Sequence, residues 1–398
     1  MNAVGIVVEY NPFHNGHQYH LERSKEVTNA DIVIAVMSGN FLQRGEPALV
    51  SKWERTKMAL HGGCDLVIEL PYVFATQKAE NFANGAISIL HALKCNSLCF
   101  GSEHGEINSF QQTYEFLKKH EEQYNYYIKK FMKEGYSYPR ALTLSFQQLE
   151  KDSELLDLSQ PNNILGYHYV KAINEQKTNI APFTVKRAAA GYHDTSFSSS
   201  NIASATSIRK ALFHHNENPI INVVPPFTYA SLQNTSTQQW EHYFSLLKYA
   251  IMTMSTEELA KIYEMEEGLE NRISAAIVES ESFQQLMEKL KTKRYTWTRL
   301  QRLCTHILTK VKKEEIKKAT LTGKAEYIRL LGMSENGRRY LKNIKKDLPI
   351  PLIAKVSAFS HPGLTIDIKA AHTYNQIFPE PLRSHLLKAE FSTPPIMY

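Results

Sequence analysis

Two histidines near the N-terminus have the type and spacing that phosphate chemistry requires. His14 and His17 flank Asn15 and Gly16, so that residues 14–17 read His-Asn-Gly-His. Each imidazole can offer an N–H group to a phosphate oxygen, and Gly16 lets a ligand approach the backbone closely. A donor aimed at the charge that develops on a transferring phosphoryl group stabilises the transition state more than the ground state. The residues alone also permit a plainer interpretation, in which both rings only bind backbone groups or water.

The position of this motif supports the phosphate interpretation. The motif follows the apolar run Ala3–Val8 and precedes a helix-length stretch near His17–Thr28, so it lies between a strand and a helix. Backbone N–H groups at a helix N-terminus, together with the helix dipole, bind phosphate. The sequence contains neither the G-x-x-x-x-G-K-[ST] loop nor the G-x-G-x-x-G fingerprint of other nucleotide-binding proteins. His14 and His17 are therefore predicted to be catalytic residues of a different kind of phosphate site.

A second motif, SATSIRKAL at residues 204–212, has the composition of a helix start. We expect Thr206 and Ser207 to cap the first turn, which places Arg209 where its guanidinium can reach an anion. Taken alone, this motif is typical of an ordinary capped amphipathic helix. In combination with the two histidines, it predicts that Arg209 is a third catalytic residue.

The elements that must position these motifs alternate along the first half of the chain. Short runs rich in Val, Ile and Leu alternate with helix-length stretches, which is typical of an α/β domain with an open parallel sheet. The carboxyl ends of parallel strands face one crevice, so the polar residues that follow each run are expected to converge on one site. The predicted strands are Ala3–Glu9, Asp31–Ser38, Asp65–Leu70 and Ser97–Gly101, and the predicted helices are His17–Thr28, Ser51–His61 and Lys78–Leu93.

Polar residues on later loops are weaker candidates for the same site. Arg44 follows the second predicted strand and either meets phosphate or remains a solvated loop residue. Asn162 and Asn163 follow a proline, where they either cap a helix or contact a nucleotide. Arg187 ends the strand-like segment 182–187 and is better placed for an anion.

Charge is distributed unevenly along the chain. The whole sequence carries a net charge of +6, but Lys289–Lys346 contains 18 Lys and Arg residues against four acidic residues. This excess indicates a polyanionic partner such as RNA. In the predicted helix Thr298–Lys313, apolar residues recur at helical spacing and a basic stripe occupies another face. The stripe comprises Arg299, Arg302, His306, Lys310 and Lys313.

A second basic segment, Asn336–Lys346, adds Arg338, Arg339 and Lys342. Tyr340 lies between them and is predicted to stack on a base. We expect both segments to contact the phosphate backbone of RNA, the alternative being that each is only the solvated face of a structural helix.

The domain organisation follows from these patterns. Residues 1–215 are predicted to form the α/β catalytic domain, and residues 216–398 a mainly helical, basic region with a small α/β end, with the boundary near His214–Pro226. Successive helices are expected from about Thr237 to Lys318. Two later segments, 352–359 and 364–368, look like strands.

Composition and cysteine usage exclude several classes of protein. Hydrophobic content of 43% and aromatic content of 11% are those of a folded globular chain. No apolar stretch approaches the roughly 20 residues of a membrane span, and no signal peptide is evident, so the protein is predicted to be cytoplasmic. The four cysteines lack the spacing of a zinc site and are predicted to be buried thiols. No metal site is predicted, and no protein partner can be inferred.

Together the motifs resemble a known family. The pairing of His-x-Gly-His with the later Ser-Ile-Arg element is similar to the HIGH-type nucleotidyltransferase superfamily, whose members attack the α-phosphate of a nucleoside triphosphate. Seven strings narrow this resemblance to the bacterial tRNA(Met) cytidine acetate ligases. In chain order they are GIVVEYNPFHNGHQYHL, MSGNFLQRGEPALVSKWERTKMAL, CDLVIELPYVFATQKAENFANGA, FGSE, PNNILGYHYVKA, KRAAAGYHD and SATSIRKAL. The resemblance is strong over about the first 215 residues and looser beyond them.

The resemblance implies a Rossmann-like fold and a two-step reaction. ATP and acetate would form acetyl-adenylate and pyrophosphate, and the acetyl group would then pass to the exocyclic amine of the wobble cytidine in elongator tRNA(Met). By the same resemblance, the Ser-Ile-Arg element would clamp the leaving pyrophosphate. The implied ATP-binding residues are Val7, Val8, Glu9, Tyr10, Asn11, Pro12, Phe13, His14, Asn15, Gly16, His17, Gln18, Tyr19, His20, Gly101, Asn162, Arg187 and Ser207.

Two other functions stay open on the residues alone. An adenylyltransferase acting on a small metabolite would explain the first region but would give the basic region no role. A non-catalytic RNA-binding protein would explain the basic region but would give the histidine motif no role. Acetate is already ionised at neutral pH, so its activation requires positioning and charge neutralisation rather than a general base. The resemblance leaves open whether Mg²⁺ is required.

Overall fold

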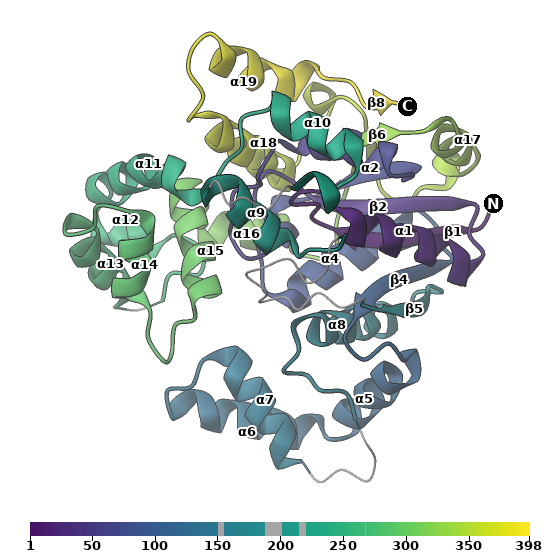
Figure 1. The fold of residues 1–398 in the computed structure, drawn as a ribbon. Coiled ribbons are helices and arrows are strands. Elements are labelled where there is room, and N and C mark those ends of the chain that lie inside the picture. Colours follow the sequence, from purple (N-terminus) through teal and green to yellow (C-terminus); the bar gives the residue numbers. More distant parts are fainter. Residues whose placement is uncertain (150–154, 188–200, 215–219, 267) are drawn as a thin grey trace.

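Among the residues that the structure describes, one eight-stranded sheet forms the centre of the protein, and helices cover both of its faces (Figure 1). The structure is a computed structural model that describes residues 1–149, 155–187, 201–214, 220–266 and 268–398. The sheet is open and most of its strands are parallel, so the predicted α/β fold class is confirmed.

The strand order explains where a ligand site can form. Across the sheet the order is β5-β4-β1-β2-β3-β6-β7, and β8 pairs with β6. From β1 the chain continues to β2 and β3 on one side, and then returns to place β4 on the other side of β1. Ligands of open α/β sheets bind at the carboxyl ends of strands where the order reverses, which here is between β1 and β4. The strands are β1 (Ala3–Val8), β2 (Ile32–Ser38), β3 (Leu66–Leu70), β4 (Ser97–Ser102), β5 (Ala181–Lys186), β6 (Ile328–Met333), β7 (Leu352–Ile353) and β8 (Ile396–Met397).

Helices fill the intervals between the first five strands. The four predicted strands and the three predicted helices of this part are all present within a few residues of their expected bounds. The strand-like segment before Arg187 is also confirmed, as β5. The helices of this part are α1 (Asn15–Thr28), α2 (Lys52–His61), α3 (Tyr72–Ala75), α4 (Ala79–Ala92), α5 (Ile107–Lys119), α6 (Glu121–Lys133), α7 (Tyr138–Gln148) and α8 (Pro161–Glu175).

The second half of the chain is mainly helical, as predicted, and it also supplies three strands. Strands β6, β7 and β8 extend the sheet that the first region forms, with β6 antiparallel to β3. The helices are α9 (Ala205–His214), α10 (Pro226–Asn234), α11 (Trp240–Thr253), α12 (Thr256–Ala260), α13 (Leu269–Val278), α14 (Phe283–Leu290), α15 (Trp297–Leu308), α16 (Lys313–Ala319), α17 (Glu335–Ile344), α18 (Pro362–Asn375) and α19 (Leu382–Ser392), with 3-10 turns η1 (Ile220–Asn222), η2 (Lys345–Asp347) and η3 (Val356–Ala358).

Two expectations for the closing part need correction. Segment 364–368 is not a strand but belongs to α18, where His361 caps the helix by accepting a hydrogen bond from the Gly363 N–H at 3.0 Å. Its Asp367 is buried and accepts a hydrogen bond from the Tyr72 N–H at 2.7 Å, so tertiary packing overrides the β-like composition. Segment 352–359 is a strand only at its first two residues. The centre of the expected boundary, residues 215–219, lies outside the described residues.

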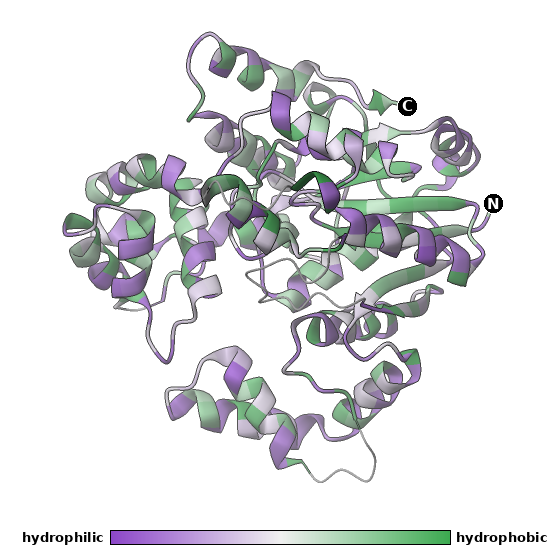
Figure 2. Cartoon of the chain, in the orientation of Figure 1, coloured by the Kyte–Doolittle hydropathy of each residue, from purple (hydrophilic) through white to green (hydrophobic). Residues whose placement is uncertain are grey.

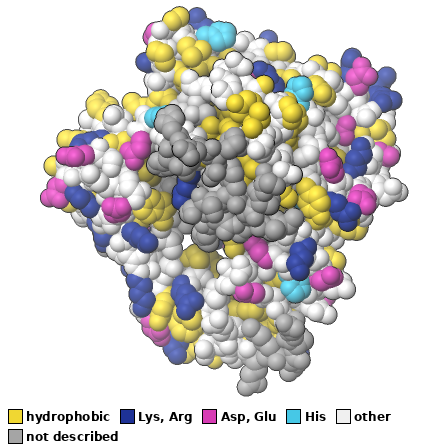
Figure 3. Space-filling view, in the orientation of Figure 1, with side chains coloured by type: hydrophobic (Ala, Val, Ile, Leu, Met, Phe, Trp, Pro, Cys, Tyr) yellow, Lys and Arg dark blue, Asp and Glu magenta, His cyan; other side chains and the backbone are white. Residues whose placement is uncertain are grey.

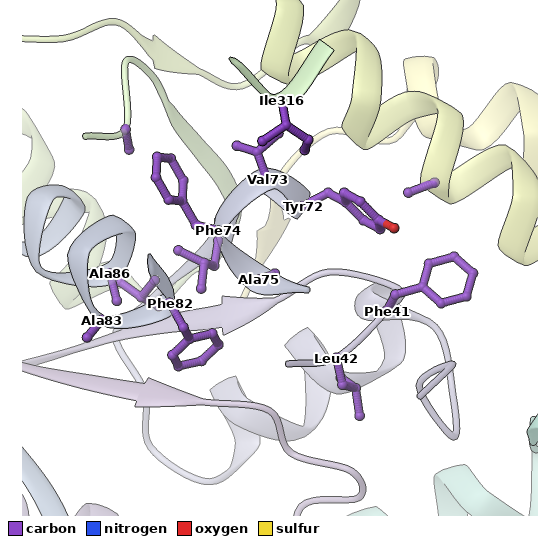
Figure 4. Packing of buried hydrophobic residues seen from close by; sticks show 14 of the residues in the cluster. Phe41, Leu42, Tyr72, Val73, Phe74, Ala75, Phe82, Ala83, Ala86 and Ile316 are labelled. Atoms are coloured by element: carbon purple, nitrogen blue, oxygen red, sulfur yellow. The ribbon is translucent and has the colours of Figure 1, made fainter. Parts of the chain in front are cut away.

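The sheet separates two hydrophobic cores. Ile32, Ile34 and Val36 of β2 face one core, whereas the alternate residues of the same strand face the other, as the pleat requires. The larger core includes aromatic residues of the loop after β2 and of α3 and α4 (Figure 4). Figure 2 shows the central strands in hydrophobic colours, whereas surface helices such as α1 and α17 carry many hydrophilic residues. The four cysteines are buried and unpaired, which confirms the prediction of buried thiols.

A buried ionic cluster fastens the C-terminal helix to the sheet. The Lys52 Nζ atom lies 2.9 Å from Glu69 and 2.7 Å from Glu390, and Arg329 Nη1 lies 3.0 Å and 2.7 Å from the same two carboxylates. Two cations therefore share two carboxylates with almost no solvent exposure. None of the described helices combines the length and the hydrophobicity that a bilayer crossing requires.

Candidate active site

A cavity of about 270 Å³ lies at the carboxyl ends of the parallel strands, where the strand order reverses. It is lined by residues that follow β1, β2, β4 and β5 and by the N-termini of α1, α8 and α9. Most of the predicted ligand-binding residues line it, namely Val7, Val8, Glu9, Tyr10, Asn11, His14, Gly16, His17, Tyr19, His20, Gly101, Asn162, Arg187 and Arg209. The predicted residues outside its lining are Pro12, Phe13, Asn15, Gln18 and Ser207.

The turn between β1 and α1 is held by aromatic packing. Tyr10 has a φ of 50°, in the left-handed region that few side chains adopt, and its ring is buried. The ring centroid lies 4.7 Å from that of Phe13 and 4.9 Å from that of His17. Phe13 is fully buried and packs on Phe227 of α10, which explains why it does not line the cavity. These contacts support an unusual backbone at the start of the histidine motif.

His14 and His17 form the N-terminal cap of α1. The Nδ1 atom of His14 accepts a hydrogen bond from the Gly16 N–H at 3.0 Å, and Nδ1 of His17 accepts one from the His14 N–H at 3.3 Å. Because Nδ1 is the acceptor in both rings, the imidazole proton of each neutral ring must reside on Nε2. The two rings stack with their centroids 3.7 Å apart. Both interpretations of the motif are therefore compatible, since capping leaves Nε2–H of His14 as a donor. The ring of His17 also forms a hydrogen bond with the backbone carbonyl of Pro12, which a phosphate oxygen would have to replace.

The histidines of the motif are neutral at physiological pH. Burial, together with the nearby charges of Arg187 and Arg209, lowers the pKa of His14 to about 3. Burial also holds the pKa of His17 well below its usual value, and that of His20 at about 4. The rings thus offer hydrogen bonds without carrying a charge, and any neutralisation of an anion must come from other residues.

Positively charged side chains that can neutralise an anion surround the cavity. Arg44, Lys186, Arg187 and Arg209 all line it. Arg209 Nη1 donates to the carbonyl oxygen of Asn11 at 2.9 Å, and Nη2 lies 3.1 Å from Glu46 Oε2. The guanidinium of α9 is thereby fixed directly against the histidine-containing turn. The part of the string KRAAAGYHD from residue 188 onward lies outside the described residues.

The cap of α9 differs from the prediction. Ser204, rather than Thr206 or Ser207, caps this helix, because its Oγ accepts a hydrogen bond from the Ser207 N–H at 3.1 Å. Ser207 is buried and its own hydroxyl donates to the Ser204 carbonyl oxygen at 2.8 Å. Thr206 lines the cavity instead. The Ser-Ile-Arg element therefore contributes Arg209 and a threonine to the cavity, while its serine stabilises the helix start.

The N-terminus of α8 is capped by a residue from the loop after β4. Glu103 accepts hydrogen bonds from the backbone N–H groups of Asn162 at 3.2 Å and Asn163 at 2.8 Å. It also accepts one from the Asn162 side-chain amide at 2.6 Å. Of the two alternatives for the asparagines, helix capping is therefore performed by Glu103 instead, and Asn162 lines the cavity. The described residues hold no group of three or more His, Cys, Asp or Glu side chains arranged to bind a metal ion.

Comparison with known proteins shows the family to which the chain belongs. A model of the HIGH Nucleotidyl Transferase family matches residues 1–389. The tRNA(Met) cytidine acetate ligase of Geobacillus sp. (strain WCH70) is 51% identical over 407 aligned positions that cover 100% of each chain. That of Bacillus subtilis (strain 168) is 50% identical and covers 100% of this chain and 98% of its own. The chain belongs to the tRNA(Met) cytidine acetate ligase family.

Solved structures of this family share the whole fold. Thermotoga maritima TmcAL in its apo form I matches with a TM-score of 0.91 and 32% identity, and the match covers 100% of this chain and 99% of that one. The same protein bound with alpha-thio ATP matches with a TM-score of 0.89 and 31% identity over the same shares. The resemblance stated from the motifs and the fold class are therefore confirmed at the level of the family.

The first basic segment lies on the cavity edge of the sheet. Helix α15 packs against the loop after β2, where Gln301 Nε2 donates to the Arg44 carbonyl oxygen at 2.9 Å. Gly45 of this loop has a φ of +78°, and a Cβ there would lie 2.5 Å from the Arg302 backbone nitrogen, so a glycine is required. Figure 3 shows several Lys and Arg side chains at the lower left, near the end of the group of helices α11–α15 that Figure 1 places on that side. The stripe predicted to bind tRNA therefore starts next to the cavity.

Individual residues of that stripe have different environments. Arg299 and Arg302 pair with Glu266 and Glu264 at 2.5 Å and 2.9 Å. His306 is fully buried and its Nδ1 lies 2.9 Å from the Tyr72 hydroxyl, so the expectation that it belongs to the exposed stripe is wrong. The helix ends at Leu308, and the exposed Lys310 and Lys313 lie beyond it.

The second basic segment lies on the opposite edge of the sheet. Met333, which precedes α17, pairs with Leu66 at the N-terminal end of β3, whereas the cavity lies at the carboxyl ends of the parallel strands. In Figure 1, α15 and α17 stand on opposite sides of the molecule. Tyr340 is buried and its hydroxyl donates to the Leu93 carbonyl oxygen at 2.8 Å, so it cannot stack on a base as predicted. Arg338, Arg339 and Lys342 are exposed.

Several cavity residues were not predicted from the sequence. Gln43 and Glu46 belong to the polar loop beside Arg44, and Lys186 directly precedes Arg187, so proximity to predicted residues could have found them. Phe82 and Tyr169 are helical residues that no local signal distinguishes from ordinary core positions. Figure 4 shows Phe82 and Leu42, another lining residue, among the side chains of the larger core.

Proposed function

We propose that the protein activates acetate with ATP and transfers the acetyl group to the exocyclic amine of the wobble cytidine of elongator tRNA(Met), in the cytoplasm. Acetyl-adenylate is the intermediate, and pyrophosphate and AMP are released. Membership of the tRNA(Met) cytidine acetate ligase family supports this reaction. So does the alpha-thio ATP bound by the Thermotoga relative of the same fold. The observation that carries the proposal is the pair of neutral histidines at the start of α1, surrounded by four cationic side chains.

The first step requires alignment and charge neutralisation. A carboxylate oxygen of acetate attacks the α-phosphorus of ATP, the bond to the bridging oxygen breaks, and pyrophosphate leaves. The Nε2–H groups of His14 and His17 would donate to phosphate oxygens, next to the N-terminal amides of α1. Arg44, Arg187 and Arg209 would balance the charge that moves onto the pyrophosphate. No residue needs to remove a proton, because acetate is ionised already.

The second step requires the target cytidine to enter the same cavity. The base must leave its stack, and single-stranded loops of RNA allow this at low cost. Helix α15 lies against the loop that lines the cavity, so cations at this edge, Arg299 among them, would bind the flanking phosphates. The exposed side chains of α17 lie on the other edge and would contact only a distant part of the tRNA.

The decisive experiment measures the two half-reactions separately. Acetate-dependent exchange of pyrophosphate into ATP reports the first step without tRNA, and formation of acetylcytidine in unmodified tRNA(Met) reports the whole reaction. A tRNA(Met) with uridine at the wobble position is the matched control. Exchange with acetate but no acetylation would indicate an adenylyltransferase that acts on another acceptor. RNA binding without exchange would indicate a non-catalytic protein, and either result would overturn the proposal.

A further inference from the structure

A carboxylate occupies the cavity in which two anionic substrates must bind. Glu9, the first residue after β1, lines the cavity together with Glu46. Glu46 is neutralised by Arg209, whose Nη2 lies 3.1 Å from its carboxylate. Glu9 forms no ion pair within the part of the chain that the structure describes. Its negative charge opposes the binding of both ATP and acetate, so its presence in the cavity points to a later step that needs it.

The position of Glu9 is fixed by hydrogen bonds that leave one oxygen available. Its Oε1 atom accepts a hydrogen bond from the Gln43 N–H at 2.8 Å, and its backbone carbonyl accepts one from Arg55 Nη1 at 2.8 Å. Arg55 is completely buried and also donates to the Ser38 carbonyl oxygen at 2.9 Å. The Oε2 atom has no hydrogen-bond partner among the described residues. A rigidly held carboxylate with one open oxygen is the arrangement that a proton acceptor requires.

The surroundings of Glu9 favour proton uptake. Burial raises the pKa of its carboxyl group, and the nearby Glu46 raises it further, whereas the Gln43 N–H, Arg44 and Arg209 act in the opposite direction. The charge of Glu9 in turn contributes to the raised pKa of Tyr169. The titratable and charged groups that face Glu9 from neighbouring elements are Arg44, Glu46, Arg55, Tyr169 and Arg209.

We infer that Glu9 is the general base of the acyl-transfer step. This inference rests on the proposed function. The exocyclic nitrogen of cytidine attacks the carbonyl carbon of acetyl-adenylate, and a carbon–nitrogen bond forms. The bond between that carbon and the phosphate oxygen breaks, and AMP leaves with the electron pair. The nitrogen gives its proton to Oε2 of Glu9, which yields a neutral amide and a neutral carboxylic acid. Glu9 loses this proton to solvent when the products leave.

This chemistry explains why a base serves the second step and not the first. Acetate attacks as an anion and carries no proton to remove. The cytidine amine is a weak nucleophile, because its lone pair is delocalised into the ring, and it becomes acidic only as the new bond forms. A positioned base that accepts the proton in that transition state contributes about 10²- to 10⁴-fold in rate. The cost of holding a charge near ATP is therefore offset in the second half of the reaction.

The test is Glu9→Gln, which keeps an oxygen for the Gln43 N–H but cannot accept the proton. We expect single-turnover transfer from preformed acetyl-adenylate to tRNA(Met) to fall by at least about 100-fold. Acetate-dependent ATP–pyrophosphate exchange should persist with a lower KM for ATP, because a negative charge has been removed. In the parent, the transfer rate should decline with acidification as Glu9 becomes protonated, and Glu9→Gln should lack that decline.

Two controls separate this role from others. Glu46→Gln removes the neutralised carboxylate of the loop after β2, which also lines the cavity, and should retain the acidic decline in transfer. Thermal unfolding of each variant verifies the fold. An equal loss of exchange and transfer in Glu9→Gln would assign Glu9 to the ATP site and overturn the inference, as would unimpaired transfer. Absence of exchange in the parent would instead refute the proposed function itself, so the two failures are distinguishable.

Discussion

Replacement of His14 by asparagine should separate its catalytic role from its structural one. The imidazole performs two tasks with different atoms, because Nδ1 caps α1 through the Gly16 N–H while Nε2–H is left as a donor. Asparagine is among the best N-cap residues, and its side-chain oxygen can accept the same hydrogen bond. It is too short, however, to place an N–H where the far nitrogen of an imidazole lies. His14→Asn therefore removes the donor and keeps the cap.

The expected magnitudes differ enough to be measured independently. Loss of one donor that stabilises developing charge costs about 10²- to 10³-fold in rate, or roughly 2.7–4 kcal/mol. Loss of an N-cap costs about 1 kcal/mol of stability. His14→Asn should thus slow acetate-dependent ATP–pyrophosphate exchange by at least about 100-fold with nearly parental stability. His14→Ala should show the same loss of exchange and, in addition, about 1 kcal/mol less free energy of unfolding.

The assay is steady-state exchange at saturating ATP and acetate, with urea unfolding of each variant alongside. Since His14 is neutral and its pKa is about 3, the exchange rate of the parent should show no decline from imidazole protonation between pH 8 and pH 6. If His14→Asn retains exchange within about threefold of the parent, the ring acts only as a helix cap. Nε2–H would then have no part in catalysis, and the plainer interpretation of the motif would hold.

Three further predictions concern tRNA binding and stability. Arg299→Gln should weaken tRNA binding and lower the slope of log affinity against log salt concentration by about one. Arg339→Gln, on the opposite edge of the sheet, should have a smaller effect. Equal slopes for the two variants would contradict the placement of the tRNA. Burial lowers the pKa of His306 to about 3, so the folded protein keeps this ring neutral while the unfolded chain protonates it below about pH 6.5. Acidification from pH 7 to pH 5 should therefore reduce the free energy of unfolding, by up to about 2 kcal/mol for this ring, and His306→Gln should show a shallower dependence in urea titrations. Glu390→Gln leaves two buried cations facing one carboxylate and should cost about 3–5 kcal/mol of stability, measured by chemical unfolding; a cost below about 1 kcal/mol would show that the cluster relaxes or admits water.

The sequence predicts the parts of the fold that depend on local patterns. Apolar runs between turn residues locate the first four strands, and the polar residues that follow them predict one convergent site at the carboxyl ends of the strands. The histidine motif could be assigned to a strand-to-helix turn because its neighbours on both sides have clear periodicity. Residues from Glu9 to His20 therefore come together at the cavity largely as expected.

Other features depend on contacts between distant residues and leave no local signal. Strand β6 is recognisable only through its antiparallel pairing with β3, and segment 364–368 is helical although its composition favours a strand. The cap of α8 comes from Glu103, 59 residues earlier than its partner Asn162. A capping motif in the sequence cannot reveal such a partner, because the donor and the acceptor lie on different elements.

Charge shows most clearly why position along the chain differs from position in space. The fold places the cations of Lys289–Lys346 in different environments. Acidic residues from outside the segment pair with Arg299 and Arg302, and Arg329 is buried in the ionic cluster. The side chains of α17 face solvent on the edge away from the cavity. Exposed charges interact over about 8–10 Å at physiological salt, so cations on opposite edges act on different parts of a polyanion. Cations beside the cavity are therefore the ones that can act on the phosphates that flank a bound cytidine. The number of these cations, rather than the net charge of Lys289–Lys346, should set the salt dependence of productive binding.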